Sequence, residues 1–343
     1  MVNVAVRTDA NTKIGTGHFM RCLTLANALQ RGGAECEFLC LSVPPPLQHQ
    51  AETYGHQVTL LKSEAEVLKH LASKKNHWLL VDHYDLELHF EQQARPFTQA
   101  LLVIEDLQGR HHACTHLLDA SPLRVPEDLS AFIPTTCTLF LGPQYALLRP
   151  EFLAHRRPHR ARWQRGFISL GGADPNNQCL ALLNFIHHSK HLRKFQWTLV
   201  AGPANPHLKS LKHFASTCDF KLTLLPSSNQ IAALMAEHDF AIGAGGGMTL
   251  ERACIGLPTL AIAIADNQEP SIQMLRQFDL AETLELKDLN TQNIEESLNR
   301  LQKNSSLYFQ RNQNFVDGLG AQRIAKAMLG LKDAPPEQKV TPC

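Results

Sequence analysis

His18 stands at a position where parallel α/β proteins commonly bind their ligands. An apolar run at residues 2–6 predicts a strand, a turn with Gly15 and Gly17 follows, and apolar residues then recur at helical spacing. The free amides and positive dipole of a helix start disfavour an imidazolium, and a neutral imidazole can take a proton from water. His18 is therefore either a general base, with Arg21 one helical turn further on, or a residue that merely fills the first turn.

A second ligand-binding pattern is the stretch AIGAGGGMTLERACIGLP at residues 241–258, in which an apolar strand runs into glycines and then into a helix. Glycine lets backbone amides approach an anion closely, and a helix start favours negative charge. The residues that this pattern offers to a phosphate are Gly245, Gly246, Gly247 and Thr249, the last through its hydroxyl. The stretch has neither a P-loop lysine nor the spacing GxGxxG, which argues against ATP hydrolysis and dinucleotide binding.

Glu251 and Asn267 each have two open interpretations. Glu251 falls in the first helical turn, where a carboxylate stabilises the helix dipole, and it could equally accept the two hydroxyls of a ribose. Asn267 follows the strand expected at residues 259–264, either as a cap of the next helix or as a ligand contact. Both lie past the carboxyl end of an expected strand, the edge at which such sheets bind ligands.

Acidic and aromatic residues also follow two expected strands of the first half. VDHYDL places Asp82 and Tyr84 at the end of one strand, and VIEDLQGR places Glu105 and Asp106 at the end of the next. Turn chemistry alone explains such residues, because aspartate favours turns and caps. Two acidic strand ends in one half of the chain nevertheless favour a pocket.

Strands alternate with helices in both halves, which predicts an α/β fold with doubly wound parallel sheets. The simplest architecture is two similar open domains that face a cleft. We place the first domain at residues 1–154, a basic linker at 155–165, the second domain at 166–330 and a flexible tail at 331–343. Residues 307–329 carry one long helical pattern.

Composition excludes several classes of protein. Basic and acidic residues balance at 33 and 32, so broad capture of nucleic acid or of an anionic membrane is not expected. No export signal or membrane-spanning apolar run is seen, and nine dispersed cysteines indicate reduced thiols, which together predict a cytoplasmic protein. The histidine clusters at 111–112 and 187–191 lack a metal-ligand spacing, and we expect them on the solvated surface.

Taken together, the motifs are more specific than any one of them alone. RTDANTKIGTGHFMRCLTLA, VDHYDL, GPQYALLRPEF, SLGGADPNN, GAGGGMTLERACIGLP and ADNQ occur in that order. The chain thereby resembles the UDP-sugar hydrolases of pseudaminic acid biosynthesis, which cleave UDP-2,4-diacetamido-2,4,6-trideoxy-β-L-altropyranose to UDP and the free sugar. The resemblance spans about residues 1–330 and implies a GT-B-like fold of the MurG type, with two Rossmann-like domains, a cleft, and a last helix that crosses back.

The resemblance also implies roles for particular residues. His18 matches the catalytic histidine, and the positions expected to contact the sugar are Gly17, Arg21, Tyr84 and Asn267. The positions expected to bind UDP are Gly245, Gly246, Gly247, Thr249 and Glu251, the last on the ribose. Met248 departs from the family pattern, which often has a small hydroxyl residue there, and Glu105 stands where an aspartate is common.

We therefore expect an enzyme that needs no metal and no cofactor, with a UDP-sugar as its partner and a monomeric or weakly oligomeric state. Water activated by His18 would displace UDP with inversion at the anomeric carbon, while backbone amides at residues 245–249 stabilise the departing phosphate. A GT-B glycosyltransferase and a non-catalytic UDP-sugar binding protein are the alternatives.

Overall fold

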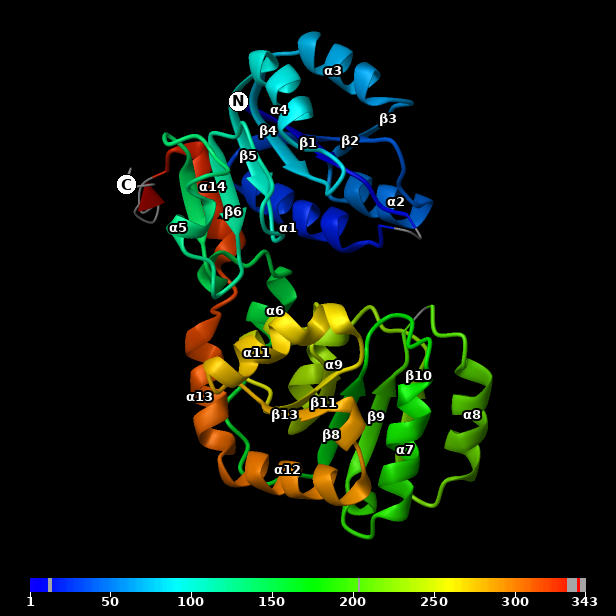
Figure 1. Ribbon diagram of the computed structural model, residues 1–343. Coiled ribbons are helices and arrows are strands. Elements are labelled where there is room, and N and C mark those ends of the chain that lie inside the picture. Colours follow the sequence, from blue (N-terminus) through cyan, green and yellow to red (C-terminus); the bar gives the residue numbers. More distant parts are fainter. Residues whose placement is uncertain (12–13, 203, 332–337, 340–343) are drawn as a thin grey trace. The chain divides into compact units, whose positions relative to one another are not determined.

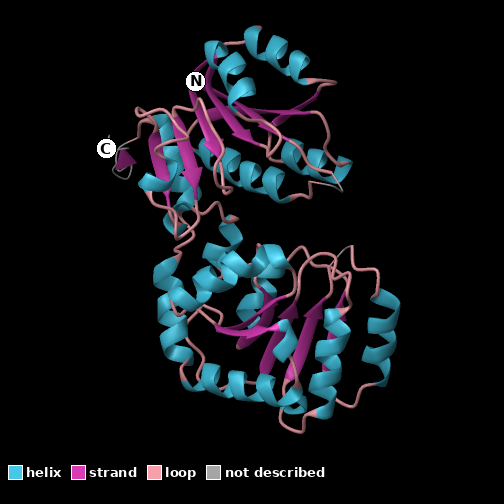
Figure 2. Cartoon of the chain, in the orientation of Figure 1, coloured by secondary structure: helices cyan, strands magenta, loops and turns pink. Residues whose placement is uncertain are grey.

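A computed structural model describes residues 1–11, 14–202, 204–331 and 338–339. The chain divides into two compact units (Figure 1): Met1–Arg149 together with the chain from Gly318 on, and Pro150–Asp317. In both units a parallel sheet lies between helices (Figure 2). The predicted class, two doubly wound parallel α/β sheets, is confirmed.

The first unit is built on one sheet with the strand order β14-β7-β6-β5-β4-β1-β2-β3, in which only the pair of β14 with β7 is antiparallel. The chain order reverses between β1 and β4, and this switch point is where open sheets bind ligands. Buried on both faces, its central strands are almost continuously apolar. The strands are β1 (Val2–Thr8), β2 (Ala34–Cys40), β3 (Gln57–Leu60), β4 (Asn76–Asp82), β5 (Thr98–Ile104), β6 (His116–Asp119), β7 (Thr138–Leu141) and β14 (Gln338–Lys339).

Helices cover both faces of this sheet. One face packs on α1 (Gly17–Arg31), α2 (Pro45–Thr53) and α14 (Gly320–Leu329). The other face packs on α3 (Glu64–Ala72), α4 (Leu88–Ala94) and the short α5 (Pro126–Leu129). The apolar stripe of α1 is buried against β1 and β2, which fixes the helix start at the carboxyl end of β1.

The second unit repeats the plan with the strand order β10-β9-β8-β11-β12-β13, all parallel. Its switch point lies between β8 and β11. The strands are β8 (Arg165–Ser169), β9 (Gln196–Val200), β10 (Leu222–Leu225), β11 (Phe240–Ala244), β12 (Thr259–Ala263) and β13 (Glu282–Glu285). The helices are α6 (Pro150–Ala154), α7 (Gln178–His188), α8 (Leu208–Thr217), α9 (Ile231–Glu237), α10 (Thr249–Ile255), α11 (Glu269–Gln277), α12 (Thr291–Lys303) and α13 (Ser305–Phe315).

The single helical pattern expected over residues 307–329 is wrong, because the chain breaks there into α13 and α14. Gly318 adopts a φ of 78°, which a helix cannot accommodate. Gly320 opens α14 so close to the backbone that an added Cβ would lie 2.3 Å from the carbonyl oxygen of Ala146. At the other end of α14, Trp78 Nε1 donates to the carbonyl of Met328 at 2.9 Å. The final helix is therefore tied to the first unit (Figure 1).

Residues 155–165, expected as a solvated linker, instead pack on the second unit, and the division between units falls earlier, after Arg149. Trp163 is buried and stacks on Phe240 with ring centroids 4.5 Å apart. Asp239 Oδ2 accepts the backbone N–H groups that lead into β8, at 2.7 and 2.9 Å. Sequence pattern alone could not show this, because the partners lie far along the chain.

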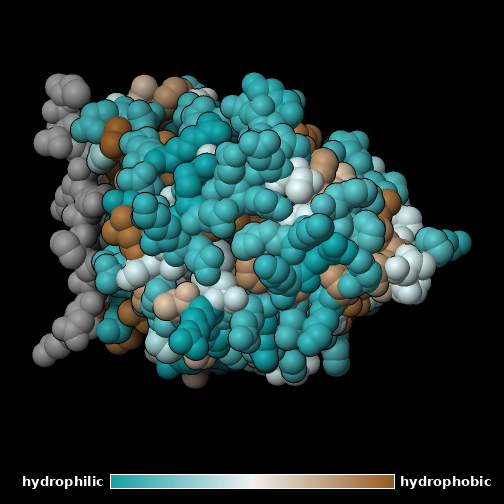
Figure 3. Space-filling model, turned by 90° about the horizontal axis from the view of Figure 1, so that it is seen from below, coloured by the Kyte–Doolittle hydropathy of each residue, from teal (hydrophilic) through white to brown (hydrophobic). Residues whose placement is uncertain are grey.

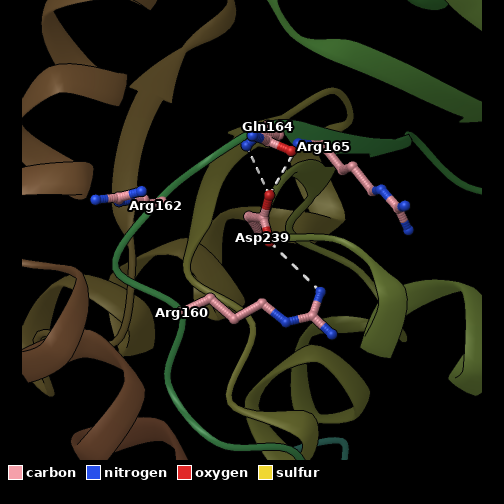
Figure 4. A pocket seen from close by; sticks show the side chains of 5 residues that line it. All are labelled: Arg160, Arg162, Gln164, Arg165 and Asp239. Carbon is pink, nitrogen blue, oxygen red and sulfur yellow. Dashed lines mark hydrogen bonds and ion pairs between the residues drawn. The ribbon is translucent and has the colours of Figure 1, made fainter.

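Three arginines of this stretch, Arg160, Arg162 and Arg165, line an open hollow together with Asp239 (Figure 4). Arg160 Nη1 lies 3.4 Å from Asp239 Oδ1. Figure 4 shows the side chains of Arg162 and Arg165 extending away from Asp239 in opposite directions, so the guanidinium groups do not converge on one anion. The basic run is a packed, partly solvated edge of the second unit.

Most of the expected tail, residues 332–337 and 340–343, lies outside the described residues. Across the described ranges, no helix combines the length and apolar character needed to cross a membrane. The face drawn in Figure 3 is mostly hydrophilic, and its hydrophobic residues lie in small separate areas.

Candidate active site

The corner between β1 and α1 is held by a buried ion-pair network. Asp9 Oδ1 accepts the backbone N–H groups of Leu41 and Ser42 at 2.7 and 3.0 Å, and its other oxygen pairs with Arg7 at 2.9 Å. Arg7 is fully buried and also pairs with Glu64. Burial alone would raise the pKa of Asp9, but hydrogen bonds and the charge of Arg7 hold that pKa far below its usual range. The corner is thus rigidly anchored to β2 and α3.

His18, the second residue of α1, is buried and meets the carboxyl end of β4. In the register of β1 with β4, Thr8 lies opposite Asp82. His18 Nδ1 lies 2.6 Å from Asp82 Oδ1, and Asp82 has no exposed surface. Residues distant in the sequence therefore form a histidine–carboxylate pair at the switch point of the sheet.

Arg21 completes the environment of Asp82. Its Nε and Nη2 atoms donate to the two oxygens of Asp82, each at 2.6 Å, in a bidentate pair. Burial would raise the pKa of Asp82, but the charge and hydrogen bonds of Arg21, with a contribution from His18, lower it to about 2. An ionised carboxylate only accepts hydrogen bonds, so Nδ1 of His18 carries a proton and Nε2 is the ring atom that can accept one.

Asp82 and Arg21 both contact Nδ1 of His18, and the two contacts together define which ring nitrogen carries the proton. Arg21 Nη2 also lies 3.2 Å from His18 Nδ1. With a proton on Nδ1, the guanidinium and the imidazole are both donors, so they form no hydrogen bond with each other. The shorter contact of Nδ1 with Asp82 therefore determines the tautomer.

Tyr84 and Asp106 extend the cluster towards solvent. The Tyr84 hydroxyl donates to Asp106 Oδ1 at 2.7 Å, and Arg21 Nη1 donates to the other oxygen of Asp106 at 2.9 Å. The Tyr84 ring stands edge-on to His18, with centroids 4.4 Å apart. Burial and the bond to Asp106 raise the pKa of Tyr84, which keeps the phenol protonated at neutral pH. Tyr84 remains 41% exposed, so its ring still presents a surface to a ligand.

A buried layer behind Asp106 holds this strand end in place. Glu105 Oε1 accepts the backbone N–H groups of Asp106 and Leu107 at 2.9 and 2.7 Å. His112 lies between two glutamates, with Nδ1 2.6 Å from Glu91 and Nε2 3.2 Å from Glu105. Burial would lower the pKa of His112, but the two carboxylates raise it to about 9. The expectation that His112 is a solvated surface residue is wrong, since the ring is buried between Glu91 of α4 and Glu105 at the end of β5.

The glycine loop of the second unit lies between β11 and α10. A Cβ added to Gly245 would lie 2.8 Å from the side chain of Ile272, so the loop packs tightly on α11. A Cβ added to Gly247 would meet nothing within 4 Å, so the loop is open at that residue. Thr249 differs from expectation: its hydroxyl is buried and donates to the carbonyl of Gly246 at 2.7 Å, which shapes the loop from inside.

The expected site residues fall into two groups, one at each switch point. The group in the first unit consists of Gly17, His18, Arg21 and Tyr84. Gly17 is exposed, and a Cβ added to it would meet no atom within 4 Å. Arg21 is engaged with two carboxylates there. In the second unit, Glu251 lies half-buried in the first turn of α10. Asn267 belongs to the 3₁₀ turn η4 (Asp266–Gln268), and its side chain lies outside the described part of the structure.

In the motif SLGGADPNN, where a strand again runs into glycines and then into a helix, Asp174 stabilises the start of the helix. Its carboxylate accepts the backbone N–H groups of Gln178 and Cys179 at 2.7 and 2.9 Å and so caps α7. As for metals, none of the described residues forms a cluster of histidine, cysteine and carboxylate groups suited to a metal ion.

Two parallel-sheet units, each with a glycine-containing turn between a strand and a helix at its switch point, define a GT-B-like fold. MurG from Acinetobacter baumannii superposes with a TM-score of 0.70 at 13% sequence identity, covering 96% of this chain and 100% of that one. No family model matches the chain.

Curated relatives agree with the resemblance expected from the motifs. The UDP-2,4-diacetamido-2,4,6-trideoxy-β-L-altropyranose hydrolase of Campylobacter jejuni is 26% identical over 276 residues, which are 80% of this chain and 96% of the relative. The spore coat polysaccharide biosynthesis protein SpsG of Bacillus subtilis is 24% identical over 301 residues, 84% of this chain and 85% of the relative. The expected resemblance to the hydrolase is thereby confirmed.

Proposed function

We propose that this protein is a UDP-sugar hydrolase whose substrate is UDP-2,4-diacetamido-2,4,6-trideoxy-β-L-altropyranose. The observation that carries the proposal is the pair of His18 and Asp82 at the switch point of the first sheet. The similarity to the Campylobacter jejuni hydrolase supports the choice of substrate. The enzyme would act in the cytoplasm as part of pseudaminic acid biosynthesis.

The proposed reaction is a direct displacement at the anomeric carbon. A water oxygen forms a bond to that carbon, the bond from the carbon to the phosphate oxygen breaks, and UDP leaves with the electron pair. His18 Nε2 accepts the proton of the water, while ionised Asp82 holds Nδ1–H and stabilises the resulting imidazolium. Because UDP is a good leaving group, the proposal needs neither a strong general acid nor a metal, and one displacement inverts the anomeric configuration.

The remaining expected residues take supporting roles in this proposal. Tyr84 and Asn267 line the sugar, and Gly17 leaves room beside His18. Backbone N–H groups of residues 245–249 receive the diphosphate and stabilise its developing charge. Arg21 orients Asp82 and Asp106 through its ion pairs, so we assign it positioning of the site in addition to any substrate contact.

Phosphorus NMR of the protein with this UDP-sugar, excess EDTA and ¹⁸O-labelled water tests the proposal. We expect free UDP to appear without ¹⁸O on its β-phosphate, because the water attacks carbon and not phosphorus. Labelled UDP would contradict the displacement at carbon. Release of UDP only after an acceptor is added would indicate a glycosyltransferase, and tight binding without turnover would indicate a binding protein.

A further inference from the structure

Arg252 lies directly beneath the glycine loop of the second unit. It belongs to α10 and is only 2% exposed. Its Nη2 atom donates to the carbonyl of Ala244, the last residue of β11, at 2.7 Å, and lies 3.4 Å from the hydroxyl of Thr249. A Cβ added to Gly243 would lie 2.4 Å from Nη1, so only glycine allows the guanidinium to pack against the strand end.

The charge of Arg252 is not neutralised by any described residue. Within the described ranges it forms no ion pair, and its buried Nη1 has no hydrogen-bond partner. Burial lowers the pKa of Arg252 to about 10, against the charge of Glu251, so the guanidinium is still charged at neutral pH. Glu251 precedes it on the same helix, where neighbouring side chains do not face each other.

A cavity beside the guanidinium does not remove this charge. The cavity measures about 10 Å³ and is lined in part by Thr249, Arg252, Thr259 and Asn312. It has room for about one water molecule. A water would hydrate Nη1 without neutralising it, and buried charges in proteins are normally paired because removing an ion from water is unfavourable.

The position of the charge indicates its partner. Arg252 is bonded to the strand end and to the residue that shapes the loop, and it is buried, whereas the loop is open at Gly247. An anion bound to the backbone N–H groups of that loop would lie close to the guanidinium through a thin layer of low dielectric, where Coulomb attraction is strong.

We propose that Arg252 provides the buried positive charge that attracts the diphosphate of UDP to the glycine loop, without touching it. The inference rests on the proposed function, because it assumes that this loop receives the diphosphate. It assigns to Arg252 both ground-state affinity for the diphosphate and stabilisation of the charge that grows as UDP departs. This role gives a reason for an arginine at position 252 of α10, where no carboxylate among the described residues pairs with it.

Calorimetric titration of UDP into the full chain and into Arg252→Met tests this assignment. We expect the Kd for UDP to rise about tenfold or more in the variant. The Kd for uridine, which lacks phosphate and is measured by saturation-transfer NMR, should not change. The melting temperature of the unliganded variant should be equal or higher, because an unpaired buried charge is replaced by a methionine of similar length.

Two further variants separate charge from shape. Arg252→Lys keeps the charge and should retain UDP affinity within severalfold, whereas Arg252→Gln can still donate to Ala244 but should bind UDP as weakly as Arg252→Met.

Each other outcome overturns the assignment. Equal loss of uridine and UDP binding would show that Arg252 only shapes the loop. Unchanged UDP binding would show that the charge of Arg252 does not contribute to the affinity for UDP. A variant that fails to fold would show that the charge is required for folding. Wild-type protein that binds UDP but does not hydrolyse the UDP-sugar would contradict only the proposed hydrolase activity. Wild-type protein that binds no UDP would contradict both that activity and the role of Arg252.

Discussion

Nδ1 of His18 lies 2.6 Å from Oδ1 of Asp82, which joins the start of α1 to the end of β4. The two strands that lead to these residues are neighbours in the sheet although β2 and β3 intervene in the sequence. Arg21 holds Asp82 from the other side in a bidentate pair. This arrangement fixes the tautomer of His18 and leaves Nε2 as its proton acceptor.

Replacing Asp82 by asparagine should remove the charge that supports the imidazolium and allow the wrong tautomer. We expect kcat to fall by about 10³- to 10⁴-fold, as in other histidine–aspartate pairs, with little change in UDP affinity. Steady-state kinetics together with UDP titration measure both quantities. Asp85→Asn, at an exposed carboxylate nearby, is the matched control and should keep the wild-type rate. An active Asp82→Asn enzyme would remove Asp82 from the proposed mechanism.

The stability of the protein should depend on pH through His112. Its pKa is raised from 6.5 to about 9, so the stabilisation is fully present below pH 6.5 and is lost as the pH rises through about 9. The shift corresponds to at most about 3 kcal/mol in the free energy of unfolding. The charged groups that face the ring are Glu91 and Glu105, with Arg110 paired to the latter.

Urea unfolding at pH about 6 and about 10 measures this effect as a difference between wild type and His112→Gln. The wild type should lose its advantage over the variant at the higher pH. A constant difference at both pH values would mean that the two glutamates do not stabilise the protonated form of His112.

Removing the hydroxyl of Tyr84 should separate its two contacts. Tyr84→Phe keeps the ring against His18 and loses the bond to Asp106, which remains paired with Arg21. We expect the free energy of unfolding to change by about 1 kcal/mol or less, and kcat/KM to fall by about tenfold if the bond orders the sugar side of the site. Kinetic assays and urea unfolding provide the two numbers. A large loss of stability with unaltered kcat/KM would make Tyr84 a structural residue.

The docking of α14 should depend on Gly320. A methyl group there would lie 2.3 Å from the carbonyl oxygen of Ala146 and 2.5 Å from the backbone of Tyr145, neither of which can rotate away. We expect Gly320→Ala to lower the free energy of unfolding by about 2 kcal/mol or more. Gly172→Ala is the control, since a Cβ there meets nothing within 4 Å. Thermal unfolding with equal losses in both variants would argue against this close approach.

Local pattern predicted most strands and helices, because their apolar spacing and glycine turns are contained in short stretches of sequence. Local pattern does not predict contacts between segments that are distant in the sequence. His18 could be chosen from its glycine corner, but its partner Asp82 depends on the adjacency of β1 and β4. The same limit hid the burial of His112 between Glu91 and Glu105 and the packing of Trp163 on Phe240.

The misassigned helix at residues 307–329 has a different cause. Its apolar periodicity continues across the break, and the turn is imposed where Gly318 takes a left-handed conformation so that α14 can reach the first unit. For Thr249, the residue type suggested a phosphate contact, but the hydroxyl is used within the loop. Residue type alone does not show which hydrogen-bond partner a side chain has within the fold.

The most direct test of the central claim is the hydrolysis rate of His18→Gln, measured by release of UDP from the UDP-sugar at saturating substrate. We expect the rate to fall by about 10²- to 10⁴-fold, the usual contribution of a general base, with unchanged UDP affinity and melting temperature. A variant that hydrolyses the substrate at the wild-type rate would contradict the assignment of His18 as the base.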